Sequence, residues 1–234
     1  MGIQLAIRVI LLEPEKAGNV GAIARSMKNF DLNDLWIVKP NVHVDGEARA
    51  LAMHGLDVLN SANIVETIEE AIGQVNVVVG TSAIMVTSSS NLSRLSITPA
   101  QLAKKVATCK GRVGIVFGRE SAGLSNQEVE ACDFIVTIPA SSKYNVLNIA
   151  TAASIVFYEI FRNKVVGKKN LASRSSKRRL LLEFETLMTG IKVQSHKRRL
   201  ARRAFRNVIS RSFMSSREAS LLLGVLRKVS AKVL

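Results

Sequence analysis

The chain has 234 residues, of which 47% are hydrophobic, and 33 Lys and Arg against 18 Asp and Glu give it a formal net charge of +15. This length can bury one large core, or one core with an appendage. No apolar run approaches the roughly 18 residues of a membrane span, and the N-terminus lacks the pattern of a signal peptide, so we expect a cytoplasmic protein without membrane contact. The two cysteines, Cys109 and Cys132, and the three histidines form no metal-ligand spacing, which predicts neither a disulfide nor a metal site.

The positive charge is concentrated at one end of the chain. Residues 162–234 hold 20 Lys and Arg and 3 Glu, a net of +17, whereas residues 1–161 have a net charge of −2. Such a surplus is typical of nucleic-acid binding, because each cation that neutralises a phosphate releases a counterion. An anionic membrane surface is the competing partner. It would favour a wide apolar face with aromatic anchors, and this segment has only three phenylalanines.

Strands and helices are predicted to alternate through the first 161 residues, which favours an α/β fold with a mostly parallel sheet covered on both faces. Runs of β-branched residues predict the strands, and an apolar period of 3.6 predicts the helices. The expected strands are 3–12, 35–38, 75–80, 112–117 and 134–138. The expected helices are about 19–30, 46–54, 64–72, 99–110, a helix that Ser125 caps with Glu128 in a capping box, and 146–161. The Ser/Thr-rich residues 87–98 are expected to form an exposed loop, long enough for a lid.

Beyond Phe161 the pattern indicates a second module. Residues 162–178 are basic, small and polar, which is typical of a linker, and helical periods follow at 179–191, 196–212 and 215–233. The division predicted is therefore 1–161, 162–178 and 179–234. The last helix has an apolar stripe that we expect the other helices to cover, formed by Leu221, Leu222, Val225, Leu226 and Val229.

Arginines recur along the middle of these three helices. They are Arg198, Arg199, Arg202, Arg203 and Arg206, with no acidic residue between positions 186 and 217. The spacing predicts a stripe that tracks phosphates; a solvated helix face is the alternative.

The turn between the strand at 134–138 and the next helix is the predicted place for chemistry, since ligands bind at the carboxyl ends of parallel strands. Asn145 and Asn148 lie there among apolar neighbours. Both could simply cap the helix. Known nucleotide-binding and hydrolase patterns do not account for the site, because the chain has no G-x-G-x-x-G after its first strand, no G-x-x-x-x-G-K-[ST] and no G-x-S-x-G.

Three loops together resemble the motif set of the SpoU/TrmH-type RNA 2′-O-ribose methyltransferases. Asn19-x-Gly21-x-x-x-Arg25 is similar to the first motif, Phe117-Gly118-x-Glu120-x-x-Gly123-Leu124 to the second, and Leu147-Asn148 to the third. They occur in the order of that family over about 140 residues. The basic helical C-terminal segment is similar to the branch that methylates cytidine or uridine at position 32 of tRNA.

The resemblance implies a parallel sheet with a C-terminal trefoil knot, a homodimer, tRNA as substrate and S-adenosylmethionine as methyl donor. It assigns the catalytic site to Asn19, Arg25, Glu120 and Asn148, with Arg25 holding a substrate phosphate. The cofactor pocket that it implies consists of Thr81, Ser82, Ala83, Gly118, Ile138, Val146, Leu147 and Asn148.

Two positions depart from the family pattern. Val146 stands where the third motif usually has Ser, and Ile84 stands where the loop after Ala83 usually has Arg, which leaves Arg94 as the candidate RNA-binding substitute. Two other functions stay open at this point: a catalytically inert RNA-binding protein with the same fold, and a methyltransferase that acts on ribosomal RNA.

Overall fold

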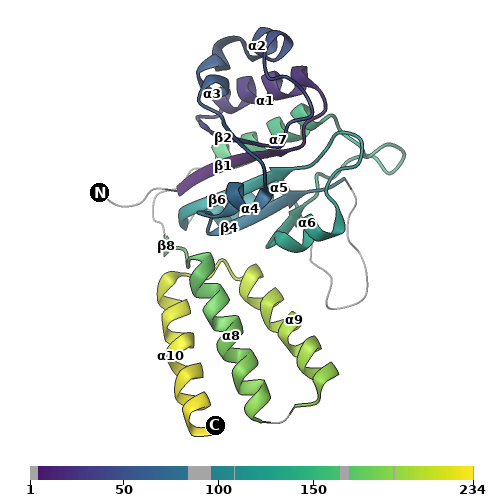
Figure 1. Cartoon of the computed structure of the whole chain (residues 1–234). Helices are drawn as coiled ribbons and strands as arrows, with labels where there is room; N and C mark the ends of the chain where they lie inside the picture. Colours follow the sequence, from purple (N-terminus) through teal and green to yellow (C-terminus); the bar gives the residue numbers. More distant parts are fainter. Residues whose placement is uncertain (1–4, 84–95, 108, 164–168, 192, 234) are drawn as a thin grey trace.

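A parallel sheet forms the centre of the molecule (Figure 1). The computed structural model describes residues 5–83, 96–107, 109–163, 169–191 and 193–233. Within them every strand ladder is parallel, in the order β3-β2-β1-β6-β4-β7-β5, with β8 beside the start of β6. The strands are β1 (Leu5–Leu12), β2 (Asp34–Val38), β3 (Asn63–Val65), β4 (Val77–Thr81), β5 (Ser96–Ile97), β6 (Cys109–Phe117), β7 (Phe134–Val136) and β8 (Lys169–Asn170). The predicted α/β class is confirmed.

Helices cover both faces of this sheet. They are α1 (Ala17–Asn29), α2 (Gly46–Ala52), the short 3-10 helix η1 (Met53–Gly55), α3 (Leu56–Asn60), α4 (Ile68–Ile72), α5 (Pro99–Ala107), α6 (Asn126–Ala131) and α7 (Ile149–Arg162). Alternate residues of β1 enter different cores, with Val9 and Leu11 packed toward α1, α5 and α7, and Ile10 toward α4 and α6. This is the period of two that a strand buried on both faces requires.

The region between β2 and β4 differs most from the predicted pattern. Asn63–Val65 forms edge strand β3, so the prediction of one helix over 64–72 is wrong there, and α4 starts only at Ile68, behind the Thr67 cap. Isoleucine and valine suit both elements, and the ladder to β2 decides the outcome. The prediction of a helix over 46–54 is also wrong at its end, because Met53 has a φ of 48° and breaks it.

Two further boundaries differ. β6 starts at Cys109, three residues before the prediction, because β1 and β8 supply hydrogen-bonding partners that the sequence pattern does not show. Of the predicted loop 87–98, residues 96–97 form β5, which pairs with β7. The rest of that loop, including Arg94, lies outside the described residues.

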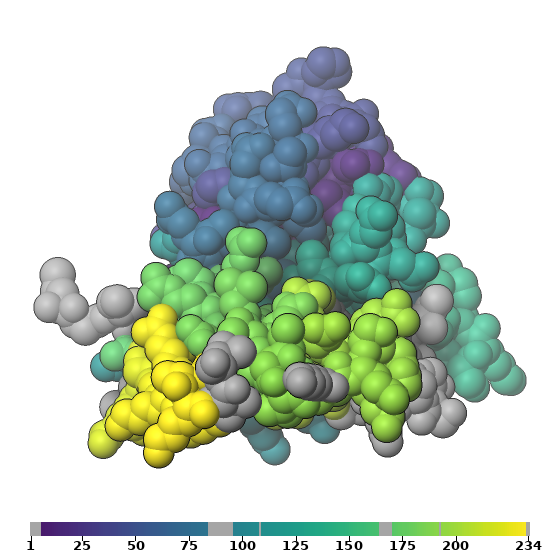
Figure 2. Space-filling model, turned by 60° about the horizontal axis from the view of Figure 1, so that its bottom comes forward, coloured from purple at the N-terminus to yellow at the C-terminus, as the bar shows by residue number. Residues whose placement is uncertain are grey.

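A helical module, defined here as residues 169–233 where described, packs at the edge of the sheet where the parallel strands begin (Figures 1 and 2). It consists of β8, α8 (Arg174–Gly190), α9 (Ser195–Arg211) and α10 (Ser216–Val233). The predicted linker is therefore wrong from residue 169 on: Leu171 and Ala172 are buried, and α8, capped by Ser173, starts at Arg174, five residues before the expected helix start. The predicted start of α10 is confirmed by the Ser215–Glu218 cap.

Asn76 joins the module to the sheet. Its side-chain amide donates to the carbonyls of Leu171 and Ala172, and its Oδ1 accepts from the backbone N–H of Arg112 at 2.7 Å. Its carbonyl accepts from the buried Lys177 ammonium, and burial lowers the pKa of that lysine. The joint fixes the module against the amino end of β6.

An aromatic contact extends the joint. Phe213, in the turn between α9 and α10, is 3% exposed and lies 5.0 Å from the ring of Phe134 at the start of β7. Because Phe213 belongs to the main core of the sheet, the module packs as a continuation of that core.

The packing of α10 corrects the prediction for its apolar stripe. Ala219, Leu223 and Leu226 join the core of the module. Four of the predicted stripe residues are exposed, namely Leu221, Leu222, Val225 and Val229. The helix is apolar over a wider arc than one neighbouring helix can cover.

Candidate active site

The three candidate motifs meet through one chain of side-chain hydrogen bonds. Asn148 Nδ2 donates to Asn19 Oδ1 at 3.0 Å, and Asn19 Nδ2 donates to Glu120 Oε1 at 2.9 Å. The other carboxylate oxygen of Glu120 accepts from the backbone N–H of Glu15 at 2.8 Å. Asn19 thus contacts two residues that lie 101 and 129 positions further along the chain, at the edge of the sheet where the strands end. The structure brings together three of the four predicted catalytic residues.

The chemistry of each group fixes the direction of this chain. Asn148 caps α7, and its Oδ1 accepts from the N–H groups of Ala150 and Thr151, so only its NH₂ can point to Asn19. A carboxylate only accepts, so Asn19 must turn its own NH₂ toward Glu120. Asn19 is therefore the bridge on which the other two depend.

Arg25, the fourth predicted catalytic residue, lies apart from this chain. Its side chain is on the exposed side of α1, and within the described part of the molecule that side chain forms no hydrogen bond or ion pair. Its backbone lies against the η1 turn, since a Cβ on Gly55 would be 2.7 Å from the Arg25 Cα. Asn19 and Glu120 therefore do not contact the Arg25 side chain in this structure, and no described residue pairs with its guanidinium.

Gly21 of the first motif has a packing role. A Cβ there would lie 2.1 Å from the backbone oxygen of Ala48, so α1 and α2 can approach this closely only with glycine. Gly118 of the second motif is similar, because its Cβ would lie 2.3 Å from the Gly123 carbonyl carbon. Both glycines shape the elements that carry the catalytic side chains.

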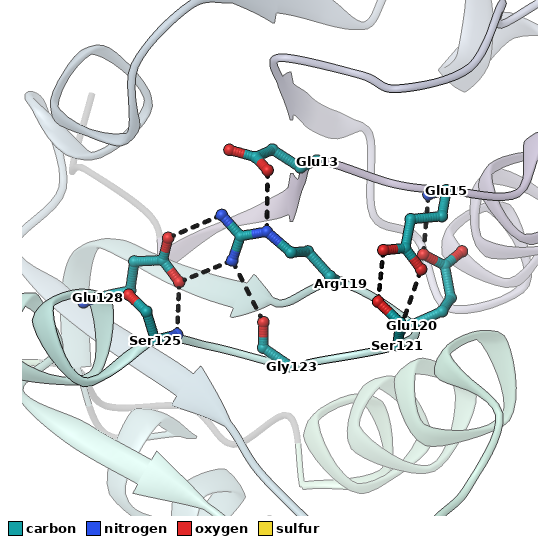
Figure 3. A network of polar contacts seen from close by, with 8 residues as sticks. All are labelled: Glu13, Glu15, Arg119, Glu120, Ser121, Gly123, Ser125 and Glu128. Carbon is teal, nitrogen blue, oxygen red and sulfur yellow. Dashed lines mark hydrogen bonds and ion pairs between the residues drawn. The ribbon is translucent and has the colours of Figure 1, made fainter.

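A second polar cluster surrounds Arg119, which the sequence did not single out (Figure 3). Its Nε pairs with Glu13 Oε2 at 2.8 Å, and its two terminal nitrogens each lie 3.1 Å from an oxygen of Glu128. Glu128 also closes the predicted capping box with Ser125, which is confirmed. Nearby, Glu15 accepts from the N–H and the hydroxyl of Ser121.

These contacts hold both carboxylates in their charged form. The hydrogen bond from Arg119 lowers the pKa of Glu13. For Glu128, burial raises the pKa, and the hydrogen bonds from Arg119 and Ser125 outweigh that effect, so its pKa is also lowered. The only signal for Arg119 in the sequence is its position inside the second motif. Glu13 contacts Arg119 because β1 and β6 are neighbours in the sheet, and the sequence does not show that adjacency.

The residues expected around a cofactor line the ends of β4, β6 and β7. Thr81 donates its hydroxyl to the Val116 carbonyl, and the Ser82 N–H donates to the carbonyl of Val136. Asn145 donates to the carbonyl of Ala83 at 3.1 Å, so the turn before α7 lies against the exit of β4. Asn145 therefore links two loops, and only Asn148 is a helix cap.

The turn presents apolar surface beside these polar groups. Val146 is 54% exposed, and Ile138 and Leu147 are half-buried. An apolar wall with a few fixed backbone carbonyls and hydroxyls is the usual composition of a nucleoside site. The residues present therefore fit the adenosyl group of S-adenosylmethionine.

The structure divides the five predicted RNA-binding arginines of α9 into two sets. Arg198, Arg202 and Arg206 contact Thr189, Glu185 and the Glu130 carbonyl. Arg199 and Arg203 are exposed, and neither has a partner among the described residues. Within those residues no helix is long and apolar enough to cross a membrane, and no cluster of three or more His, Cys, Asp or Glu could hold a metal ion.

Comparison with known proteins gives matches over nearly the whole chain. A tRNA (cytidine-2'-O-)-methyltransferase TrmJ from Methanocaldococcus jannaschii is 38% identical over 229 residues, which cover 95% of this chain and 99% of that protein. A tRNA (cytidine/uridine-2'-O-)-methyltransferase TrmJ from Escherichia coli K12 is 33% identical and covers 95% of this chain and 94% of its own. The crystal structure of TrmJ from Z. mobilis ZM4 aligns with a TM-score of 0.70 at 27% identity, covering 96% and 99% of the two chains.

Fold and site together define a parallel α/β protein with a polar site where the strands end and a basic helical module where they begin. The model of the SpoU rRNA Methylase family matches residues 6–158, the part that contains all three motifs. The chain belongs to this family. The predicted family resemblance is confirmed.

Proposed function

We propose that this protein transfers a methyl group from S-adenosylmethionine to a ribose 2′-hydroxyl of tRNA. The observation that carries the proposal is the hydrogen-bond chain from Asn148 through Asn19 to Glu120, which ties the three family motifs into one site. Both curated relatives described above are named as tRNA 2'-O-methyltransferases, which supports tRNA over ribosomal RNA. An inert RNA-binding protein would not need this hydrogen-bonded set of Asn148, Asn19 and Glu120, which argues against that alternative.

The reaction needs alignment and proton removal. S-adenosylmethionine supplies an electrophilic methyl group on a sulfonium, so the protein must present the 2′-oxygen in line with it. Ile138, Val146 and Leu147, with Thr81, Ser82, Ala83 and the backbone of Gly118, would hold the cofactor. Asn148 lies at the boundary of that pocket and the catalytic chain.

Arg25 is assigned to the substrate. Arginine keeps its proton in proteins, and its planar donors suit a phosphate. Arg25 is exposed, and no described residue occupies those donors. Both oxygens of Glu120 already accept hydrogen bonds, which favours a positioning role for this carboxylate over a role as proton acceptor.

We assign nucleotide 32 of the anticodon loop as the site, with cytidine as the preferred base because both relatives' names share it. A 2′-hydroxyl occurs on every RNA nucleotide, so a further surface must select the position. The C-terminal segment 162–234, which contains the helical module and has a net charge of +17, supplies that surface. Within the arginine stripe of α9 we assign Arg199 and Arg203 as phosphate contacts, because no described residue pairs with either side chain.

The catalytic unit is proposed to work in the cytoplasm as a homodimer with the family's trefoil knot. An aromatic cluster supports a dimer face formed by the ends of α1 and α7. Phe30 contacts Tyr158 and Phe161, which are 49% and 38% exposed. Sedimentation as a monomer at micromolar concentration would contradict this assembly.

The function is tested by transfer of a labelled methyl group to purified tRNA and, separately, to ribosomal RNA. We expect label in tRNA only, and loss of transfer in Arg25→Ala with cofactor affinity nearly unchanged. Cofactor affinity that fell with activity would contradict the role of Arg25, and equal labelling of ribosomal RNA would contradict the substrate.

The role of the module is tested by substitution, because deletion would uncover Phe134 and neighbouring core residues. Changing Arg199 and Arg203 to Ala should lower the slope of log affinity against log salt for tRNA by about 1.4–1.8, at about 0.7–0.9 per phosphate contact. Lys104→Ala, on the exposed side of α5, is the control and should leave the slope unchanged.

A further inference from the structure

Helix α6 is in contact with both functional parts of the molecule. Its first turn contains Glu128, which pairs with Arg119 in the second-motif loop, residues 118–125. Near its other end, the backbone carbonyl of Glu130 accepts a hydrogen bond of 2.6 Å from Arg206 of α9. The catalytic loop and the RNA-binding helix are thus connected through six helical residues.

Arg119 is held on every side. Besides its pairs with Glu13 and Glu128, it donates to the backbone carbonyl of Gly123, which closes the loop on itself. Its side chain is 20% exposed. The guanidinium is used as a two-sided fork, with Nε on one carboxylate and the terminal nitrogens on the other, and a lysine cannot reproduce that geometry.

The next residue in the chain is Glu120. Arg119 fastens the loop to the end of β1 and to α6, and Glu120 fastens it to Asn19 and to the backbone of Glu15. Adjacent side chains thus fix the same peptide in two directions. Loss of the Arg119 side-chain contacts would free the loop from Glu13 and α6, while Glu120 kept its hydrogen bonds to Asn19 and to the backbone of Glu15.

We propose that Arg119 is a positioning residue for methyl transfer. We propose also that α6, through its contact with Arg206, couples the position of the second-motif loop to the RNA-binding module. The proposal rests on the function proposed above. It assigns Arg206 an intramolecular role, distinct from the phosphate contacts of Arg199 and Arg203. Binding of tRNA to α9 would then set the catalytic loop through a short, stiff connection.

The first test compares Arg119→Met and Arg119→Lys with the control Arg112→Met. Arg112 is a half-buried arginine near the start of β6, the strand that precedes the Arg119 loop, and it contacts Asp34 and Gln74. We expect kcat of Arg119→Met to fall about 10- to 100-fold with KM for tRNA within about threefold, from the loss of charged hydrogen bonds. Arg119→Lys should fall nearly as far, and Arg112→Met should match wild type.

Two readouts separate positioning from general damage to the fold. Guanidinium chloride at low millimolar concentration should restore part of kcat in Arg119→Ala, and sodium chloride at equal ionic strength should not. Amide hydrogen exchange at Glu15 and Ser121 should speed up in Arg119→Met, while exchange in β1 stays unchanged. Unchanged exchange at those two amides would overturn the proposal. This exchange measurement does not require methyl transfer, so it stays informative even if the wild-type protein methylates no RNA and the proposed function fails.

The second test concerns the far end of α6. Arg206→Met should raise exchange at Ser121 and lower kcat, while the salt dependence of tRNA binding stays as in wild type. If instead the salt slope falls by about 0.7–0.9 and kcat is unaffected, Arg206 is an RNA contact and the connection through α6 is refuted.

Discussion

Asn19 is the side chain whose removal should separate the three motifs. Asn19→Ala deletes one hydrogen bond to a carboxylate and one to an amide, at 2.9 and 3.0 Å. A bond to a charged group contributes about 1.5–3 kcal/mol and a neutral one about 0.5–1.5 kcal/mol. If both are needed in the reacting geometry, the sum of about 2–4.5 kcal/mol corresponds to a fall of roughly 30- to 2000-fold in the rate of methyl transfer.

Single-turnover transfer to tRNA, with cofactor affinity measured by calorimetry, tests this. Asn19→Asp should be at least as impaired, because it places a second carboxylate opposite Glu120. The control is Asn60→Ala, which removes an exposed acceptor of Arg49 away from the site. A rate for Asn19→Ala within threefold of wild type would refute the view that this chain of hydrogen bonds organises the site.

Three further predictions concern stability. Gly21→Ala should cost about 1–3 kcal/mol of unfolding free energy, since its Cβ meets the fixed Ala48 backbone, whereas Gly224→Ala, with nothing within 4 Å, should stabilise α10 by about 0.5–1 kcal/mol; thermal unfolding distinguishes them. Asn76→Ala should lower the unfolding free energy by about 2–4 kcal/mol, because three backbone groups lose a partner, and should weaken tRNA binding while cofactor binding persists. A variant as stable as wild type would show that Asn76 does not hold the module to the sheet. Folding lowers the pKa values of Glu13 and Glu128, so the contribution of these two carboxylates to the unfolding free energy is complete above the ordinary glutamate pKa of about 4.3 and is lost as pH falls through the folded values. The stability of wild type should therefore fall more steeply below about pH 4 than that of Arg119→Met. Parallel curves of stability against pH would show that the pairs with Arg119 contribute nothing.

The features that local chemistry determines were predicted well from the sequence. The switch from β-branched residues to a helical period located the turn before α7, and Ser125 with Glu128 marked a capping box that the structure contains. That Asn19, Glu120 and Asn148 share a site was implied by the family resemblance and not by local chemistry, and in the structure Asn19 contacts both of the others.

The features that depend on strand adjacency were not predictable in this way. Glu13 reaches Arg119 only because β1 and β6 are neighbours, and the ends of both strands are far apart in the chain. Leu171 is buried because β8 extends the sheet beside β6, although its polar neighbours suggested a linker. The exposed stripe on α10 likewise depends on which face α8 covers.

The most direct test of the central claim is to map the methyl group. The protein should be incubated with labelled S-adenosylmethionine and tRNA carrying either cytidine or uridine at position 32, and the product digested to nucleosides and sequenced at the modified position. We expect label on the ribose 2′-oxygen of nucleotide 32, with cytidine the better substrate. Label on a base, or on the ribose of a nucleotide outside the anticodon loop, would contradict this expectation.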